Sequence, residues 1–221
     1  MRTTPLPLRT LRVAVAEFAT AGPDTSWQTL LGATAPAIDL SRPAHQQAAL
    51  RWLNAWGCRI RYPRPGEPDV AGAGLGRWWA QWSATLPGAG VTLAELADPA
   101  IDALGPAYAA LVATPVSAPP RARGLGPTAA TKLLYALRPA ALMPWDAAIA
   151  DSLHRGRDAA AYVAHQRLGR EWAVRVLAEA GLDEPALAAS LGQPDRTLAK
   201  MLDDYCYLAY TRGTVPAGDP Q

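Results

Sequence analysis

The sequence predicts an all-α protein. Apolar residues recur at helical spacing along most of the 221-residue chain, and the alternation typical of a β-strand is confined to one short stretch. Half of the residues are apolar, which is enough to build a sizeable core. We therefore expect a helical region at residues 1–113, a second helical region at 114–213 and a tail at 214–221. The two regions are expected to form one integrated unit or two lobes.

The N-terminal region begins with an apolar stripe at residues 11–18, followed by a stretch punctuated by Gly, Pro and Asp. A second stripe covers residues 48–56 and ends at a glycine. Residues 58–62 alternate and are expected to be a short extended piece, with no evident partner strand. The Pro- and Gly-rich stretch at 63–76 predicts a loop. The tryptophan cluster Trp78, Trp79 and Trp82 is then expected to begin the next helix.

The remaining helices are expected over residues 93–97, 101–112, 129–137, 147–153, 159–180, 185–191 and 197–210. Residues 188–202 also match the spacing of a helix-turn-helix, the fold that places a recognition helix in the DNA major groove. The second helix of that pattern carries Asp195, Asp203 and Asp204 against Arg196 and Lys200. Because an acidic helix repels phosphate, two packed helices account for the pattern better than a DNA-reading helix does.

Composition excludes several classes of protein. No apolar run approaches the roughly 20 residues that a membrane-spanning helix needs, and the N-terminus lacks the apolar core of a signal peptide. We therefore expect a cytoplasmic protein with no membrane partner. Cys58 and Cys206 are the two cysteines, too few for a four-cysteine cluster or a zinc knuckle, and His45, His154 and His165 show no ligand spacing. No metal and no cofactor are expected.

The most informative motif lies at residues 124–128, where the Gly-x-Gly turn of Gly124 and Gly126 opens an apolar helix. Glycines at such a turn let backbone amides approach a phosphate without a Cβ in the way. Asp146 follows 20 positions after Gly126, at the start of another helix. Residues 121–157 contain six cations and two anions, so this segment carries a charge of +4 in a chain of net charge +2. The anions are Asp146 and Asp151, and the cations are Arg121, Arg123, Lys132, Arg138, Arg155 and Arg157.

This segment resembles the helix-hairpin-helix DNA glycosylases, a family that includes endonuclease III and adenine glycosylase, over roughly residues 121–153. The resemblance implies a DNA-repair hydrolase that binds duplex DNA through the hairpin and cleaves the N-glycosidic bond of a flipped base. Asp146 matches the catalytic aspartate of the family. Thr128 lies where lyase members carry a nucleophilic lysine, which implies a monofunctional glycosylase without strand cleavage. The family's helix before the hairpin ends in Leu-Pro, and residues 118–123 differ from this, so that helix is expected to be short or displaced.

The DNA-binding residues are expected to be Gly124, Gly126, Thr128, Arg121, Arg123 and Lys132, and Trp145 is the candidate for the base pocket. Arg121 and Arg123 flank the hairpin and suit phosphate because an arginine binds it bidentately. Each candidate also has a structural alternative. Asp146 has the position of a helix N-cap, Lys132 that of a solvated charge, and Thr128 that of a helix-start residue.

Three functions remain open at this point. The first is a DNA glycosylase that uses Asp146 to stabilise an oxocarbenium-like sugar and to orient water. The second is a DNA-structure-binding module of the same fold without chemistry, in which Trp145 closes the pocket. The third is a helical scaffold whose clustered tryptophans contact an unknown protein partner, and an exposed tryptophan patch would favour it.

Overall fold

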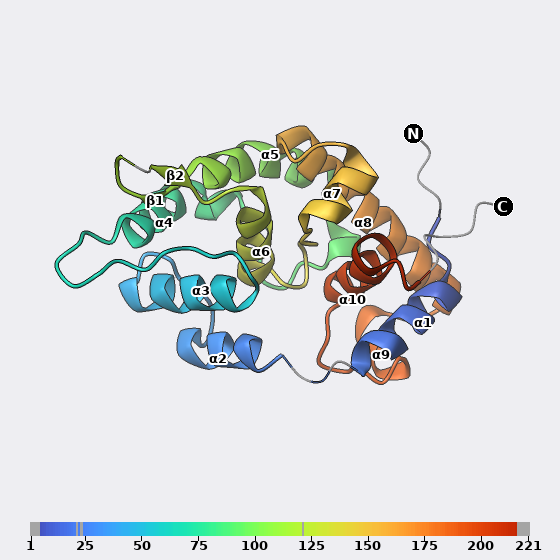
Figure 1. The fold of residues 1–221 in the computed structure, drawn as a ribbon. Helices are drawn as coiled ribbons and strands as arrows, with labels where there is room; N and C mark the ends of the chain where they lie inside the picture. The colour runs from blue at the N-terminus through green and yellow to red at the C-terminus, as the bar shows by residue number, and fades with distance from the viewer. Residues whose placement is uncertain (1–4, 21, 23, 121, 216–221) are drawn as a thin grey trace.

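The computed structural model describes residues 5–20, 22, 24–120 and 122–215, and this part of the chain is mostly helical (Figure 1). The fold class expected from the sequence, all-α, is confirmed. The α-helices are α1 (Leu8–Ala19), α2 (Thr25–Thr34), α3 (Pro43–Ala55), α4 (Val70–Trp82), α5 (Asp98–Ala113), α6 (Pro127–Leu137), α7 (Ala147–His154), α8 (Ala159–Ala180), α9 (Glu184–Ser190) and α10 (Leu198–Cys206). Two 3₁₀ turns, Ser83–Thr85 and Leu93–Glu95, and a π-helical turn, Tyr207–Arg212, complete the helical structure.

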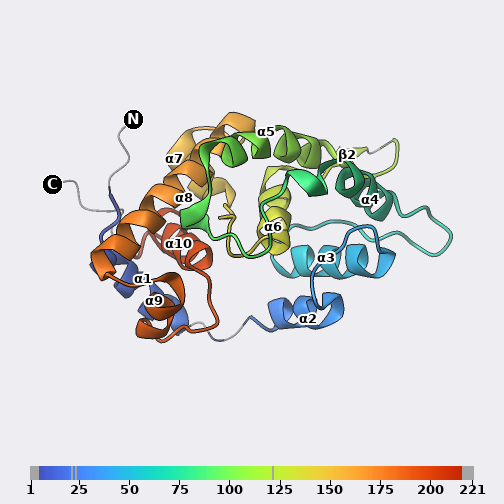
Figure 2. The same ribbon diagram turned by 180° about the vertical axis from the view of Figure 1, so that it is seen from behind.

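The helices form two groups joined through α5 and α6 (Figures 1 and 2). Helix α3 packs against α2 and α4, while α8 packs against α7, α9 and α10. Helix α5 contacts α4 and α6 on one side and α8 on the other, and α1 crosses to pack on α10 and α8. The first helix is thus seated among helices of the 114–213 region, and the two regions pack around one continuous apolar core.

Helix α8 covers residues 159–180 as expected, and the helices expected at 101–112, 129–137, 147–153 and 185–191 are present with shifts of a few residues. The helix expected at 197–210 divides into α10 and the π-helical turn, and residues 93–97 form only a 3₁₀ turn. Residues 214 and 215 of the expected tail pack on the fold, where Thr214 N–H donates to the Leu208 carbonyl and Val215 is buried. Residues 216–221 lie outside the described part of the chain.

The prediction of a loop over 63–76 is wrong in its second half, because α4 already begins at Val70. The Asp69 side chain caps this helix by accepting a hydrogen bond from Gly72 N–H at 2.8 Å. Packing outweighs the low helix propensity of the glycines: a Cβ at Gly74 would lie 2.8 Å from the Pro115 carbonyl oxygen. The tryptophan cluster therefore occupies the second half of the helix, not its start.

Two other expectations also differ from the structure. Helix α2 lies within the stretch expected to be irregular, and its N-cap Asp24 accepts hydrogen bonds from the backbone N–H groups of Ser26 and Trp27. Residues 58–62 form no strand. The strands of the described chain are β1 (Pro115–Ser117) and β2 (Arg123–Gly124), which pair antiparallel as a short ribbon between α5 and α6.

Candidate functional site

The Gly-x-Gly hairpin joins α5 to α6 through the β1–β2 ribbon. Helix α5 continues to Ala113, so it is not shortened, and the β1–β2 ribbon returns the chain to the helix end at Gly124. A Cβ on Gly124 would lie 2.7 Å from the Val112 carbonyl oxygen, which explains why this position has no side chain. Leu125 N–H and Gly126 N–H donate to the Thr114 and Val112 carbonyls. These hairpin amides are therefore used inside the protein.

Gly126 ends the hairpin and caps α6 with φ of 85° and ψ of 161°, a backbone conformation that only glycine adopts readily. Pro127 occupies the first turn of α6, where a missing N–H costs nothing. The amides of Thr128 and Ala129 are in the same first turn, at the positive end of the helix dipole. Arg123 is exposed on β2, whereas Arg121 lies outside the described residues.

Asp146 lines a cavity of about 460 Å³ between the two groups of helices. Its walls come from segments far apart in the sequence: Phe18 of α1, Asp24 before α2, Trp56 after α3, Lys132 of α6, Asp146 before α7, and α10 with the following π-helical turn. The volume is within the range typical of small-molecule sites. Phe18, Asp24 and Trp56 are not among the candidates that the sequence provides, because no local motif marks them. The α10 residues belong to the helix-turn-helix pattern, which does not indicate a place on this cavity wall.

The Asp146 carboxylate is held by two neutral donors. Its Oδ1 accepts a hydrogen bond from Ile149 N–H at 2.9 Å, so Asp146 is the N-cap of α7. Its Oδ2 accepts a hydrogen bond from the Thr211 hydroxyl at 2.7 Å. Thr211 belongs to the π-helical turn, an irregularity often found at functional sites. The residue thus combines the N-cap role with a position on the cavity wall.

The segment leading to Asp146 is anchored at three consecutive residues. Gln166 on α8 binds both the N–H and the carbonyl of Met143, at 2.9 and 2.8 Å. His165 Nε2 lies 3.1 Å from the Pro144 carbonyl, and the Thr131 hydroxyl lies 3.2 Å from the carbonyl of Trp145. Because these backbone groups are fixed from α6 and α8, the position of Asp146 is fixed as well.

Trp145 lines the cavity but is only 1 % exposed. Its ring packs edge-on against Tyr108 and Tyr162 and contacts the rings of His154 and His165. The other tryptophan that lines the cavity is Trp56, which is half-buried; its ring stacks on Tyr135 with centroids 5.9 Å apart and lies 5.5 Å from the ammonium groups of Lys132 and Lys200. An aromatic contact for a ligand in this cavity is better provided by Trp56 than by Trp145.

Lys132 points toward the cavity, not into bulk solvent. Its Nζ donates to the Trp56 carbonyl at 2.6 Å and lies 5.5 Å from the Trp56 ring centroid. The described residues provide no carboxylate within ion-pair distance of Lys132. An ammonium group of this kind is available to an anionic ligand.

The other cations of the cavity are mostly engaged by acidic residues of α10. Asp204 is fully buried and accepts hydrogen bonds from Arg196 and Lys200, and Lys200 also pairs with Asp203 at 2.9 Å. Burial lowers the pKa of Lys200, but the two carboxylates outweigh burial and hold this pKa above its ordinary value. The cations of the helix-turn-helix pattern thus bind within the protein, in agreement with two packed helices.

His154 and His165, on different helices, form a pair that sequence spacing does not reveal. His154 Nε2 lies 3.0 Å from His165 Nδ1. Burial lowers the pKa of His154 to about 4 and that of His165 to about 3, so both rings are neutral at pH 7. A carbonyl only accepts, so His165 carries its proton on Nε2 toward Pro144 and its Nδ1 accepts from His154.

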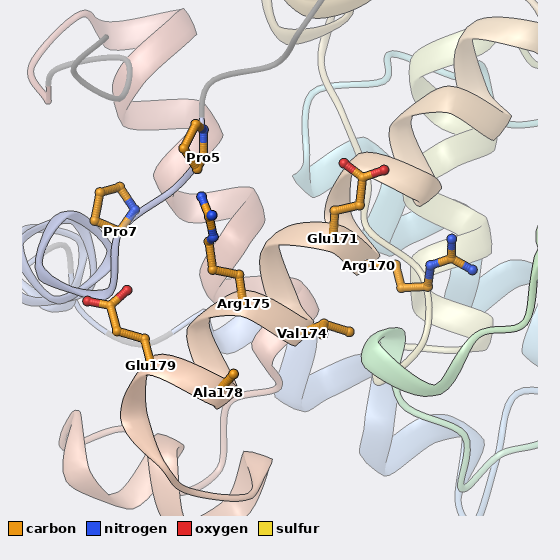
Figure 3. A pocket seen from close by; sticks show the side chains of 8 residues that line it. All are labelled: Pro5, Pro7, Arg170, Glu171, Val174, Arg175, Ala178 and Glu179. Carbon is orange, nitrogen blue, oxygen red and sulfur yellow. The ribbon is translucent and has the colours of Figure 1, made fainter. Parts of the chain in front are cut away.

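A hollow of about 790 Å³ on the outer face of α8 contains none of the candidate residues of the sequence (Figure 3). Two of its charged residues make contacts within the protein: Arg170 pairs with Asp98, and Glu179 accepts a hydrogen bond from Leu8 N–H. Arg175 also lines it, and Val174 is 51 % exposed. This hollow shares no lining residue with the cavity that contains Asp146.

Within the described chain, no group of three or more His, Cys, Asp or Glu side chains is arranged to hold a metal ion. None of the described helices combines the length and apolar character that crossing a bilayer requires. The chain matches no protein-family model, no curated protein and no solved structure. Its function is therefore inferred from the residues of the site.

Proposed function

We propose that this protein binds DNA and hydrolyses the N-glycosidic bond of a flipped base, with Asp146 as the carboxylate at the reacting sugar. The observation that carries the proposal is the position of Asp146 on the wall of a cavity of about 460 Å³, one α6 helix away from the Gly-x-Gly hairpin. The sequence resemblance of residues 121–153 to helix-hairpin-helix glycosylases suggests the same role.

The chemistry needs a fixed negative charge. As the base departs, the sugar gains positive charge, and a carboxylate held in place before the reaction stabilises that charge without reorganisation. Asp146 meets this requirement, since Ile149 N–H and the Thr211 hydroxyl orient its two oxygens. Thr128, at the position of the lyase lysine in the resembling family, supports a hydrolytic reaction without a covalent intermediate.

The cavity also suits a flipped base. Its volume admits a small planar ligand, and Trp56 offers an aromatic surface next to the Lys132 ammonium. Since Leu125 and Gly126 use their amides internally, contacts to phosphate are expected from the first turn of α6, through Thr128, and from the arginine side chains around the hairpin.

The test is binding of a duplex with a cationic abasic-site mimic, compared with an undamaged duplex. The mimic reproduces the charge of the transition state, so the wild type is expected to prefer it by at least about tenfold, or about 1.4 kcal/mol. Asp146→Asn is expected to lose this preference. Asp158→Asn is the matched control, because Asp158 is the N-cap of α8 and does not line the cavity. An equal loss in both variants, or none in Asp146→Asn, would contradict the catalytic role.

A second candidate is DNA binding without chemistry, favoured by the fact that both Asp146 oxygens already accept hydrogen bonds within the protein. It predicts equal affinity for both duplexes. The scaffold alternative lacks its expected support: the large exposed apolar residues of the described chain are Val13, Leu31, Tyr62, Val174 and Leu182, and each tryptophan is buried or half-buried.

A further inference from the structure

The cavity that contains Asp146 also contains a cation without an ionic partner. Lys132 Nζ donates a hydrogen bond to the Trp56 carbonyl at 2.6 Å and lies 5.5 Å from the centroid of the Trp56 ring. Among the described residues, no carboxylate lies within ion-pair distance of this ammonium group. Because an ammonium group has more donors than this hydrogen bond uses, Lys132 can also donate to a ligand in the cavity.

The segments that carry Lys132 and Asp146 are in contact. Helix α6 lies between the group of α2, α3 and α4 and the group of α7 and α10 (Figures 1 and 2). The Thr131 hydroxyl, on α6, lies 3.2 Å from the carbonyl of Trp145. Since Lys132 follows Thr131 and Asp146 follows Trp145, this contact holds the two charged residues on neighbouring parts of the cavity wall. The described structure shows no ion pair between them, so a ligand between the two side chains meets both charges.

The other charged residues of the lining are compensated. Two cations and two acids pair with one another, namely Arg196, Lys200, Asp203 and Asp204. Asp24 is exposed and caps α2, so solvent and the positive end of the helix offset its charge. Arg212 is exposed as well, and water screens its charge. Lys132 and Asp146 are half-buried, so their opposite charges act most strongly on a ligand inside the cavity.

Hydrolysis of an N-glycosidic bond produces charges of both signs. The C1′–N bond breaks, its electron pair leaves with the base, and the sugar becomes positive. A base that is neutral in DNA therefore departs as an anion, whose negative charge is shared with the carbonyl oxygens of the ring. Water then adds its oxygen to C1′, and the proton that it loses neutralises the anionic base. A negative group at the sugar and a positive group at the base both stabilise this separation of charge.

We propose that Lys132 is a second catalytic residue, which stabilises the departing base as an anion, and that the substrate is a base that is neutral in DNA and carries a carbonyl oxygen. This inference rests on the proposed glycosylase function and adds the group that acts on the base. Lys132 suits this role because its ammonium group lies against the Trp56 ring, the aromatic surface of the cavity. A cationic, alkylated base is a poor substrate here, since it leaves without a negative charge and meets a like charge at Lys132.

The experiment measures the dissociation constants of free bases in two pairs of matched ring size, urate with hypoxanthine and barbiturate with uracil. The first member of each pair is an anion at neutral pH, and the second is neutral. The wild type is expected to bind the anion of at least one pair about tenfold more tightly than its neutral partner. Lys132→Gln removes the charge and keeps a donor for the Trp56 carbonyl, so it is expected to lose this preference. Lys132→Arg keeps the charge and is expected to keep the preference.

Arg155→Gln is the matched control, because Arg155 is an exposed cation outside the lining of the cavity. The proposal is overturned if the wild type shows no preference for the anion of either pair, or if the preference survives in Lys132→Gln. An equal loss in Arg155→Gln would overturn it as well. Lys132→Met, which keeps the aliphatic part of the side chain, replaces Lys132→Gln if that variant does not fold.

The outcomes separate this inference from the glycosylase proposal. A preference for the cationic mimic that depends on Asp146, without a preference for anionic bases, supports the glycosylase and overturns the role of Lys132. A preference for anionic bases that depends on Lys132, without one for the cationic mimic, supports the contact between Lys132 and the base and contradicts the chemistry at Asp146. Both preferences, each lost in its own variant, support both proposals.

Discussion

The glycines of the hairpin can be explained by phosphate binding or by the packing and backbone conformation of the fold, and the two explanations predict opposite effects of substitution. If Gly124 is small only to admit a phosphate, Gly124→Ala weakens DNA binding and leaves stability unchanged. In the structure the new Cβ of Gly124→Ala would lie 2.7 Å from the Val112 carbonyl oxygen, inside the protein. At Gly126 a Cβ would have no atom within 4 Å, but the backbone conformation, with φ of 85° and ψ of 161°, is unfavourable for any residue with a side chain. Both substitutions are therefore expected to destabilise the fold.

The magnitudes follow from these two causes. Forcing an atom into a packed region costs about 1–3 kcal/mol, and placing alanine in a backbone region reserved for glycine costs about 1–3 kcal/mol. For a chain of this size, 1 kcal/mol lowers the melting temperature by about 2–4 °C. We expect Gly124→Ala and Gly126→Ala each to lower it by about 2–12 °C.

Thermal unfolding followed by circular dichroism measures the effect, and Gly32→Ala is the control. Gly32 lies in the last turn of α2, and the position that a Cβ would take there has no atom within 4 Å, so alanine is expected to stabilise by up to about 1 kcal/mol. Melting temperatures of the hairpin variants equal to or above that of wild type would refute the packing explanation. A loss of DNA affinity at unchanged stability would restore the phosphate explanation for Gly124.

Three further outcomes are expected. Asn54→Ala removes both hydrogen bonds to Ile60, so stability is expected to fall by about 1–3 kcal/mol and limited proteolysis is expected to cut within residues 58–69 sooner. Thr211→Val removes the hydrogen bond to Asp146 Oδ2, so the preference for the cationic mimic is expected to fall. The free energy of unfolding is expected to change by no more than about 1.5 kcal/mol. The pKa of His165 is lowered by burial to about 3, below its unfolded value near 6.5, so its contribution to stability is present above pH 6.5 and is lost as pH falls. Denaturant titration is expected to show a loss of about 2 kcal/mol from this group at pH 5, and a flatter profile in His165→Gln.

The sequence predicts the parts of the fold that depend on local periodicity. Helix α8 has an unbroken apolar pattern and a capping Asp158, and its predicted bounds are those of the structure. The position of Asp146 before a helix is also predictable, because an acidic residue after Pro144 and Trp145 is typical of an N-cap. Both inferences use only neighbours in the chain.

The features that the sequence does not predict depend on contacts between distant segments. The glycines of α4 predict a loop on propensity, but Gln46, Asp69 and Pro115 pack so closely on them that a larger residue has no room. Trp56 and Thr211 reach the site only because α3 and the π-helical turn meet α6 and α7 in space. No residue type or spacing near either position indicates this meeting.

The charges of the cavity distinguish Asp146 from the acids of α10 as a partner for the cationic transition state of the proposed reaction. Four acids line the cavity, namely Asp24, Asp146, Asp203 and Asp204. Asp203 and Asp204 pair with cations, so their charge is largely cancelled by contact. Asp24 is likewise held by neutral donors, namely the first amides of α2 and Trp56 Nε1, but it lies before α2 and not in the segment that follows the hairpin. Asp146 is oriented by an amide and a hydroxyl, and neither donor neutralises its charge. Under the proposed function, a carboxylate fixed by neutral donors keeps its full charge for a sugar that becomes positive, and Lys132, which donates to the Trp56 carbonyl and pairs with no carboxylate of the described residues, would offset the negative charge of the ligand.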